Sequence, residues 1–223
     1  MSDPAATQAF YGRWAHLYDV VATLPGIESW RSQAADALAL SPGDTVVEMG
    51  CGTGANLPHL RERVGPEGRV VGVDLTAGML DRARDRIDAS GWDNVHLARG
   101  DASRPPVAGP VDAVVSTFLV GLLPDPAAAV DAWLDLLAAD GSIVLLNAGR
   151  SDRALAAPLN LAFRAFVRLS APGGGAGVPP SPATRLEERI DAATTAVARG
   201  TATSGRRRLA GGFVRLARGR RPL

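Results

Sequence analysis

The sequence predicts an α/β fold in which helices cover both faces of a doubly wound, mostly parallel sheet. Two observations support this prediction. Short apolar segments at 45–48, 69–74, 95–101 and 111–118 each have the length and composition of a buried strand. Helical patterns at 29–40, 55–63, 77–89 and 125–139 alternate with them. Strands that alternate with helices pair in parallel through right-handed crossovers.

The first strand runs directly into a glycine-rich turn. Gly50, Gly52 and Gly54 allow a sharp bend and bring a ligand against bare main chain. The helix that follows carries Pro58 in its first turn, where the missing N–H does no harm. The segment therefore has the arrangement of a nucleotide site.

The remaining elements have recognisable boundaries or faces. In the helix at 77–89, apolar residues recur at helical spacing, and the helix at 125–139 opens with Asp125 as N-cap before Pro126. Its expected apolar face is Val130, Trp133, Leu134 and Leu137. Residues 201–208 and 212–218 are expected to form two closing strands joined at Gly211-Gly212.

Acidic residues end three successive strands: Glu48, Asp74 and Asp101. The carboxyl ends of parallel strands meet at one edge of a sheet, where the second acid faces a ribose. The pattern Gly50-x-Gly52-x-x-Ala55 also fits the dinucleotide fingerprint, so a nicotinamide-dependent oxidoreductase is one alternative. An acid just before the glycines instead suits a ligand that carries a cation there, rather than a pyrophosphate.

These motifs, in this order, resemble those of the class I S-adenosylmethionine-dependent methyltransferases. The resemblance covers roughly residues 10–150 and rests on Glu48-x-Gly50-x-Gly52-x-Gly54, Val73-Asp74, Gly100-Asp101-Ala102, 111–118 and 137–146. The branch most similar is that of the ubiquinone/menaquinone-biosynthesis and phospholipid methyltransferases, because 11–19 resembles the aromatic segment that closes over the cofactor there.

The resemblance implies one Rossmann-like methyltransferase domain over 1–223, with sheet order 3-2-1-4-5-7-6 and strand 7 antiparallel. It also implies an N-terminal helical cover at 1–40 and a substrate-side insertion at 151–182. Within that insertion we expect an amphipathic helix at 154–169 and a mobile loop at 171–182. The helix is either a lid or membrane-facing patch, or an ordinary packing helix.

The cofactor implied by the resemblance is S-adenosyl-L-methionine. The residues expected to contact it are Tyr11, Tyr18, Glu48, Gly50, Cys51, Gly52, Gly54, Asp74, Leu75, Met79, Asp101, Ala102, Ser116 and Thr117. Cys51 is expected to pack beneath the cofactor rather than act as a nucleophile. No catalytic residue is assigned: His16 is the candidate base if the acceptor must lose a proton, although it could equally form a hydrogen bond within a helix. No metal is expected.

The acceptor is expected to be small or lipid-like, because Leu119, Val120 and Leu122 follow the fourth strand. The same region lacks an Asn-Pro-Pro-Tyr-like signature, which argues against a nucleobase amino group. The expected activity is therefore methyl transfer to an apolar acceptor. The alternatives are the oxidoreductase and a non-catalytic S-adenosylmethionine-binding protein.

Composition agrees with one domain in 223 residues, and no apolar run approaches the length of a membrane helix. The polar N-terminus and the single cysteine favour a cytoplasmic protein. Every basic side chain among the 24 is arginine. Residues 1–150 hold 11 Arg and 19 acids, a net charge of −8, whereas 151–223 hold 13 Arg and 4 acids, a net charge of +9. From Arg199 onward there are eight arginines and no acid. This run could contact anionic lipid or nucleic acid, or its arginines could be solvated on edge strands. We expect no nucleic-acid partner and allow a peripheral membrane contact, and the oligomeric state is left open.

Overall fold

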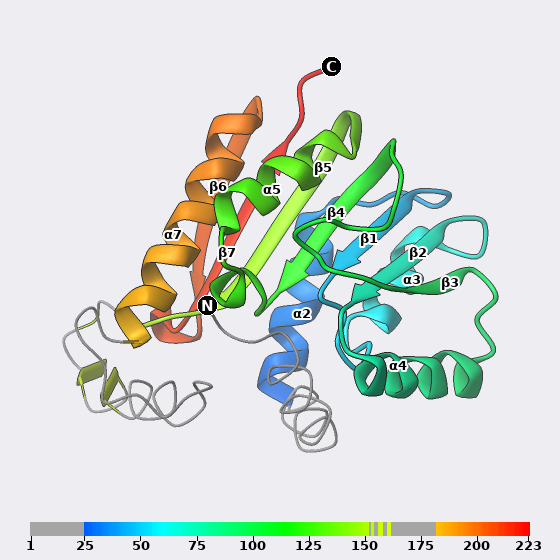
Figure 1. Cartoon of the computed structure of the whole chain (residues 1–223), viewed down its shortest axis with the longest axis horizontal. Helices are drawn as coiled ribbons and strands as arrows, with labels where there is room; N and C mark the ends of the chain where they lie inside the picture. The colour runs from blue at the N-terminus through cyan, green and yellow to red at the C-terminus, as the bar shows by residue number, and fades with distance from the viewer. Residues whose placement is uncertain (1–24, 152, 154–155, 158–159, 162–181) are drawn as a thin grey trace.

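A computed structural model describes residues 25–151, 153, 156–157, 160–161 and 182–223. Within these residues one seven-stranded sheet has the order β3-β2-β1-β4-β5-β7-β6, as predicted (Figure 1). Strands β1 to β5 are parallel, and β7 is antiparallel to both of its neighbours. The strands are β1 (Thr45–Met49), β2 (Arg69–Asp74), β3 (Val95–Arg99), β4 (Val111–Thr117), β5 (Leu137–Ala148), β6 (Thr203–Leu209) and β7 (Val214–Arg220).

Helices cover both faces of the sheet. The helices are α2 (Pro25–Ala37), α3 (Leu57–Val64), α4 (Ala77–Ser90), α5 (Pro126–Asp135) and α7 (Pro182–Gly200), with short 3₁₀ turns η1 (Val120–Leu122) and η3 (Ala210–Gly212). One buried cluster joins the sheet to α5 and α7 around Trp133 and Ile190. A second joins the opposite face to α2, α3 and α4 around Leu38, Leu60 and Ala83. The result is a three-layer α/β arrangement.

The predicted boundary between the helix at 125–139 and the next strand was wrong. Helix α5 ends at Asp135, and Leu137 belongs to β5, where it pairs with Val111. The main chain explains the early end, because Val111 N donates to Leu136 O at 2.9 Å and draws this segment into the sheet. Leu137 is still buried, but it is buried as a strand residue.

Helix α7 was not predicted at all. Its buried residues Ile190, Ala193, Ala196 and Val197 lie at helical spacing, but most of them are small, so the apolar stripe is weak in the sequence. The two closing strands are confirmed, each ending later than predicted. They are joined by η3, where Gly211 and Gly212 both have positive φ.

Most of the expected N-terminal cover and of the insertion lies outside the described residues. Of 1–40, the structure describes 25–40, which hold α2. Of 151–182, it describes seven residues, so most of the helix expected at 154–169 and all but the last residue of the loop expected at 171–182 lie outside the described residues. None of the described helices is both long enough and apolar enough to cross a bilayer.

Candidate functional site: a glycine turn between acidic strand ends

The glycine turn follows β1 and is anchored on β2. The main-chain N–H groups of Gly50 and Cys51 both donate to Val73 O, at 2.8 and 2.9 Å. Gly50 and Gly54 have φ of 72° and 78°. A Cβ on Gly54 would lie 2.6 Å from a methyl group of Leu57, and one on Gly50 would lie 2.8 Å from a methyl group of Leu119. The turn therefore requires glycine for its conformation and for the space around it.

The second acid is tied directly to this turn. The Asp74 carboxylate accepts from Gly52 N at 2.9 Å and from Thr76 N at 2.8 Å. Burial raises the pKa of Asp74, and these two main-chain donors oppose the increase. The tips of β1 and β2 are thus one hydrogen-bonded unit, as expected for residues that share a ligand.

Glu48 lies beneath the turn, wholly buried, in a polar network that links four elements. Its Oε1 accepts from Asn56 Nδ2, and its Oε2 has no hydrogen-bond partner among the described residues. The same Nδ2 donates to Thr117 Oγ1 at 2.9 Å, and Arg31 Nη1 donates to Thr117 Oγ1 at 2.9 Å and to Asn56 Oδ1 at 3.0 Å. A buried acid with one oxygen unsatisfied is costly, so this network is prepared for a further donor.

Burial also sets the ionisation of this network. Desolvation raises the pKa of Glu48 to about 7, Asn56 and Arg31 oppose the increase, and the nearby Asp74 adds to it. A cation placed beside Glu48 would favour its ionised form. The carboxyl group is therefore poised to change its charge when a positively charged ligand arrives.

The third acid is more open than the other two. Asp101 is exposed, and its Oδ1 accepts from Ser103 N at 2.8 Å. Next to it, Ala102 is buried and its carbonyl accepts from Trp133 Nε1 at 2.6 Å. A helix on one face of the sheet thus fixes the loop that carries Asp101.

The end of β4 completes this edge. Ser116 Oγ donates to Met49 O at 3.0 Å, so its hydroxyl already joins β4 to β1. Phe118 follows with a φ of 57°, and the Arg31 guanidinium lies 5.4 Å from the centre of its ring. This distance is within the range of a cation–π contact.

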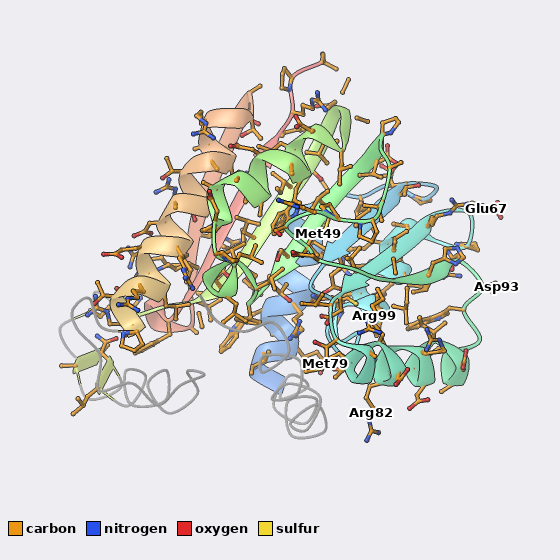
Figure 2. The ribbon with its side chains drawn as sticks, viewed as in Figure 1. Met49, Glu67, Met79, Arg82, Asp93 and Arg99 are labelled. Carbon is orange, nitrogen blue, oxygen red and sulfur yellow. The ribbon has the colours of Figure 1, made fainter. Side chains whose placement is uncertain are left out.

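The expected contact residues fall into three groups. Gly50, Gly52, Gly54, Glu48, Asp74, Asp101, Ala102, Ser116 and Thr117 gather at the carboxyl edge of β1 to β4. Leu75 and Met79 follow β2; Leu75 is partly exposed, and Met79 is buried at the start of α4 (Figure 2). Tyr11 and Tyr18, as well as His16, lie outside the described residues.

The Cys51 thiol is buried beneath the turn. Burial is the main cause that raises its pKa well above the usual value, and the charges of Glu48 and Asp74 add to this. The thiol packs against Gly72, where a Cβ would lie 2.8 Å from Sγ. A protonated, enclosed thiol is a poor nucleophile, which agrees with a packing role. Within the described part of the chain, no three His, Cys, Asp or Glu residues are grouped so as to hold a metal ion.

Arg31 and Asn56 were missed in the sequence analysis. Asn56 is the N-cap residue of α3, but its side chain makes no capping bond and instead joins Glu48 to Thr117. Its place directly after the glycine turn was the available signal. Arg31 gave no such signal, because its partners are 25 and 86 residues away along the chain.

Comparison with known proteins agrees with this geometry. Residues 46–141 match a family described as "Methyltransferase domain". The chain is 31% identical over 163 residues to phosphatidylethanolamine N-methyltransferase of Cereibacter sphaeroides, covering 72% of this chain and 77% of that protein. It is 32% identical over 108 residues to arsenite methyltransferase of Halobacterium salinarum, covering 48% of this chain and 28% of that protein.

A solved structure shares the fold. The S-adenosylmethionine-dependent methyltransferase of Aquifex aeolicus aligns with a TM-score of 0.63 at 17% identity, covering 85% of this chain and 88% of that one. The chain belongs to the class I S-adenosylmethionine-dependent methyltransferases, which use S-adenosylmethionine as methyl donor. It spans between 28% and 48% of the length of five curated relatives that it matches, among them the arsenite methyltransferase.

Proposed function

We propose that this protein transfers the methyl group of S-adenosylmethionine to a small or lipid-like apolar acceptor. The observation that carries the proposal is the Oε2 of buried Glu48, to which no described residue donates, next to a glycine turn that Asp74 holds in place. That oxygen would accept from the α-amino group of the donor. A pyrophosphate there would meet an acid instead of a cation, which disfavours the oxidoreductase alternative.

Each strand end has a separate role in this proposal. Asp74 accepts from the ribose hydroxyls, and Asp101 accepts from the adenine amino group. Asn56 and Arg31 are positioning residues, because they fix Glu48 and Thr117 through the buried hydrogen bonds described above. When bound, the sulfonium supplies an electrophilic methyl group, so the protein needs chiefly to hold the acceptor close and in line with it.

The acceptor side is apolar. Leu119 is half-buried and packs against the glycine turn at Gly50, and Leu122, in η1, is 51% exposed at the same edge of the sheet. Exposed leucine beside a polar site suits an apolar substrate better than a charged one. The similarity to a phosphatidylethanolamine methyltransferase supports a lipid-like acceptor, whereas the similarity to an arsenite methyltransferase supports a small one.

Two measurements test the proposal. Calorimetric titration with S-adenosylhomocysteine should give saturable binding, and a protein that gives no heat would refute it. Incubation with radiolabelled S-adenosylmethionine and a total lipid-plus-metabolite extract should then place label in an apolar product.

Three other outcomes would separate the alternatives. Label in a polar product would retain the methyltransferase and overturn the apolar acceptor. Binding with no transfer to any fraction would indicate a non-catalytic binding protein. Enhanced NADH fluorescence on mixing would favour the oxidoreductase.

A further inference from the structure

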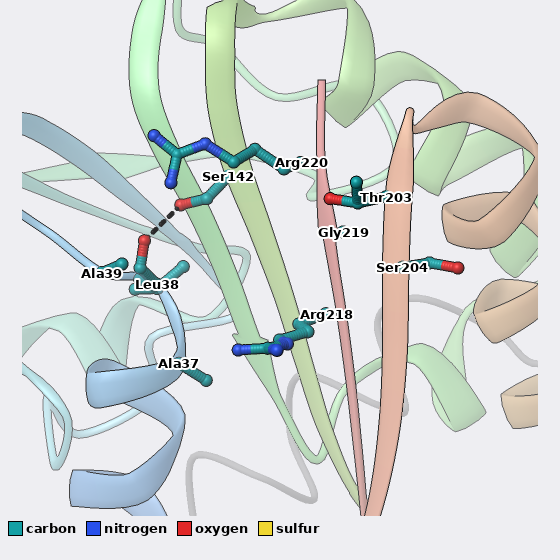
Figure 3. Close-up of a pocket in the computed structure, with 9 residues that line it drawn as sticks. All are labelled: Ala37, Leu38, Ala39, Ser142, Thr203, Ser204, Arg218, Gly219 and Arg220. Atoms are coloured by element: carbon teal, nitrogen blue, oxygen red, sulfur yellow. Dashed lines mark hydrogen bonds between the residues drawn. The ribbon is translucent and has the colours of Figure 1, made fainter. Parts of the chain in front are cut away.

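A pocket of about 250 Å³ lies at the opposite edge of the sheet from the glycine turn. It is formed where α2 ends, beside Ser142 in the middle of β5, where β6 begins and where β7 ends (Figure 3). The lining residues are Ala37, Leu38, Ala39, Ser142, Thr203, Ser204, Arg218, Gly219 and Arg220. The cofactor site lies at the carboxyl ends of the parallel strands, so this pocket is separate from it.

Two arginines enter this pocket from one strand. Arg218 pairs with Val144 and Arg220 with Ser142 in the antiparallel register of β5 and β7. Residues two apart on a strand point to the same face, so both side chains lie on the face that α2 covers. Figure 3 shows the Arg220 guanidinium near Ser142 and that of Arg218 extending towards Ala37.

The two guanidinium groups differ in whether a carboxylate group already pairs with them. Arg220 donates from Nε and Nη2 to the two carboxylate oxygens of Asp140, at 2.5 and 2.6 Å, which fixes its orientation. Arg218 is exposed, and none of the described carboxylates lies within ion-pair distance of it. Arg218 therefore carries the uncompensated positive charge of the pocket.

The surrounding residues leave room for Arg218 and add a polar wall. Its Nε lies 3.2 Å from where a Cβ on Gly205 would be, so a larger residue there would crowd the side chain. Ser142 Oγ donates to Leu38 O at 2.8 Å and so joins α2 to β5 at this place. Thr203 stands at the rim beside Gly219 (Figure 3).

We propose that this pocket binds a phosphate group. An arginine guanidinium presents paired N–H donors that match phosphate oxygens, and a second guanidinium held in place by Asp140 lowers the cost of ordering the site. The phosphate would be carried as a monoester or a diester. Such a group occurs both on soluble metabolites and on lipid headgroups.

The first experiment measures the affinity of the protein for inorganic phosphate. Calorimetric titration with inorganic phosphate at low ionic strength should show saturable binding to the full chain. Arg218→Ala should weaken it by about 10-fold, and Arg218→Lys should weaken it less, because a lysine keeps the charge but loses the paired donors. The matched control is Arg82→Ala, an exposed arginine of α4 that Figure 2 shows pointing away from the sheet.

The control variant decides between a built site and diffuse attraction. Arg82→Ala should leave phosphate affinity within about 2-fold of the parent, because it removes the same charge elsewhere. Equal losses in Arg218→Ala and Arg82→Ala would overturn the proposal, as would no saturable heat up to about 10 mM phosphate. Affinity for S-adenosylhomocysteine should be unchanged in Arg218→Ala, so failure here is distinguishable from failure of the proposed methyl transfer.

A second experiment identifies the source of the phosphate. If the ligand is a lipid headgroup, the protein should sediment with phosphatidylcholine vesicles that contain about 30 mol% phosphatidylglycerol. In that case the Arg218→Ala variant should remain in the supernatant, and pure phosphatidylcholine vesicles should not bind the parent protein. Saturable binding of inorganic phosphate without vesicle binding would assign the pocket to a soluble phosphate ester.

Discussion

Asn56 holds the carboxylate of Glu48 by donating from Nδ2 to its Oε1, and in the part of the chain that the structure describes nothing donates to Oε2. The acid is the penultimate residue of β1, and the amide belongs to the N-cap residue of the helix that follows the glycine turn. An acid that is oriented on one side and unsatisfied on the other is a binding group with its geometry already set. The first two predictions follow from this pair.

The affinity for S-adenosylmethionine should rise with pH until Glu48 is ionised. Its pKa is raised to about 7, chiefly by burial, and a cationic ligand binds the ionised form more tightly. Below this pH, binding must also expel the proton, so affinity should increase from about pH 6 to about pH 7 and then level off. Calorimetry across this range should show the slope in the parent and none in Glu48→Gln. An equal slope in both proteins would contradict the assignment.

The unliganded protein should lose stability as pH rises from about 4.5 to about 7. The pKa of Glu48 in the folded state lies above the unfolded value of 4.5. Its contribution to stability is therefore fully present below pH 4.5 and is lost as the pH rises through about 7. At about 1.4 kcal/mol per pH unit, the loss is about 3 kcal/mol. Urea unfolding at several pH values measures it. Glu48→Gln should reduce the slope, leaving the part that Asp74 contributes through its own raised pKa, whereas the exposed control Glu62→Gln should retain the full slope.

Replacing Asp74 should weaken binding of S-adenosylhomocysteine and loosen the turn. Asp74→Ala loses the acceptor for the ribose as well as the bonds from Gly52 N and Thr76 N, and we expect a loss of about 1–3 kcal/mol in binding. Calorimetry measures the affinity, and thermal unfolding measures the loosening. Asp93→Ala removes an exposed acid before β3, which Figure 2 shows at the edge of the molecule, and should change neither. Unchanged affinity in Asp74→Ala would exclude the ribose role.

Crowding at Gly54 can be separated from its backbone conformation. Gly54→Ala and Gly91→Ala both place alanine at positive φ, with φ of 78° and 63° in the parent. A Cβ on Gly54 would lie 2.6 Å from Leu57 and 3.2 Å from the Cβ of Ala83, whereas one on Gly91 would meet open space. Gly91→Ala should therefore cost about 1 kcal/mol of stability and Gly54→Ala about 1–3 kcal/mol more. Urea unfolding tests the difference, and equal costs would show that crowding contributes nothing.

The sequence predicted those features that local patterns encode. Strand alternation, the glycine turn and the acids at strand ends are all short-range patterns, and the resemblance to a family supplied the sheet order. The predicted end of α5 was wrong because Leu136 and Leu137 are drawn into the sheet by Val111, which lies earlier in the chain. The network around Glu48 was only partly foreseen, since Arg31 reaches Thr117 across 86 residues. Such contacts depend on the finished packing and leave no local signal.

The position of β7 between β5 and β6 has a consequence for the order in which the sheet can be assembled. This strand pairs with β5 on one side and with β6 on the other, although it is the last strand along the chain. During synthesis, β5 and β6 would each present an open hydrogen-bonding edge until Val214–Arg220 has left the ribosome. The nascent protein would therefore be most prone to self-association just before β7 emerges, and would depend on that strand to close the gap between β5 and β6.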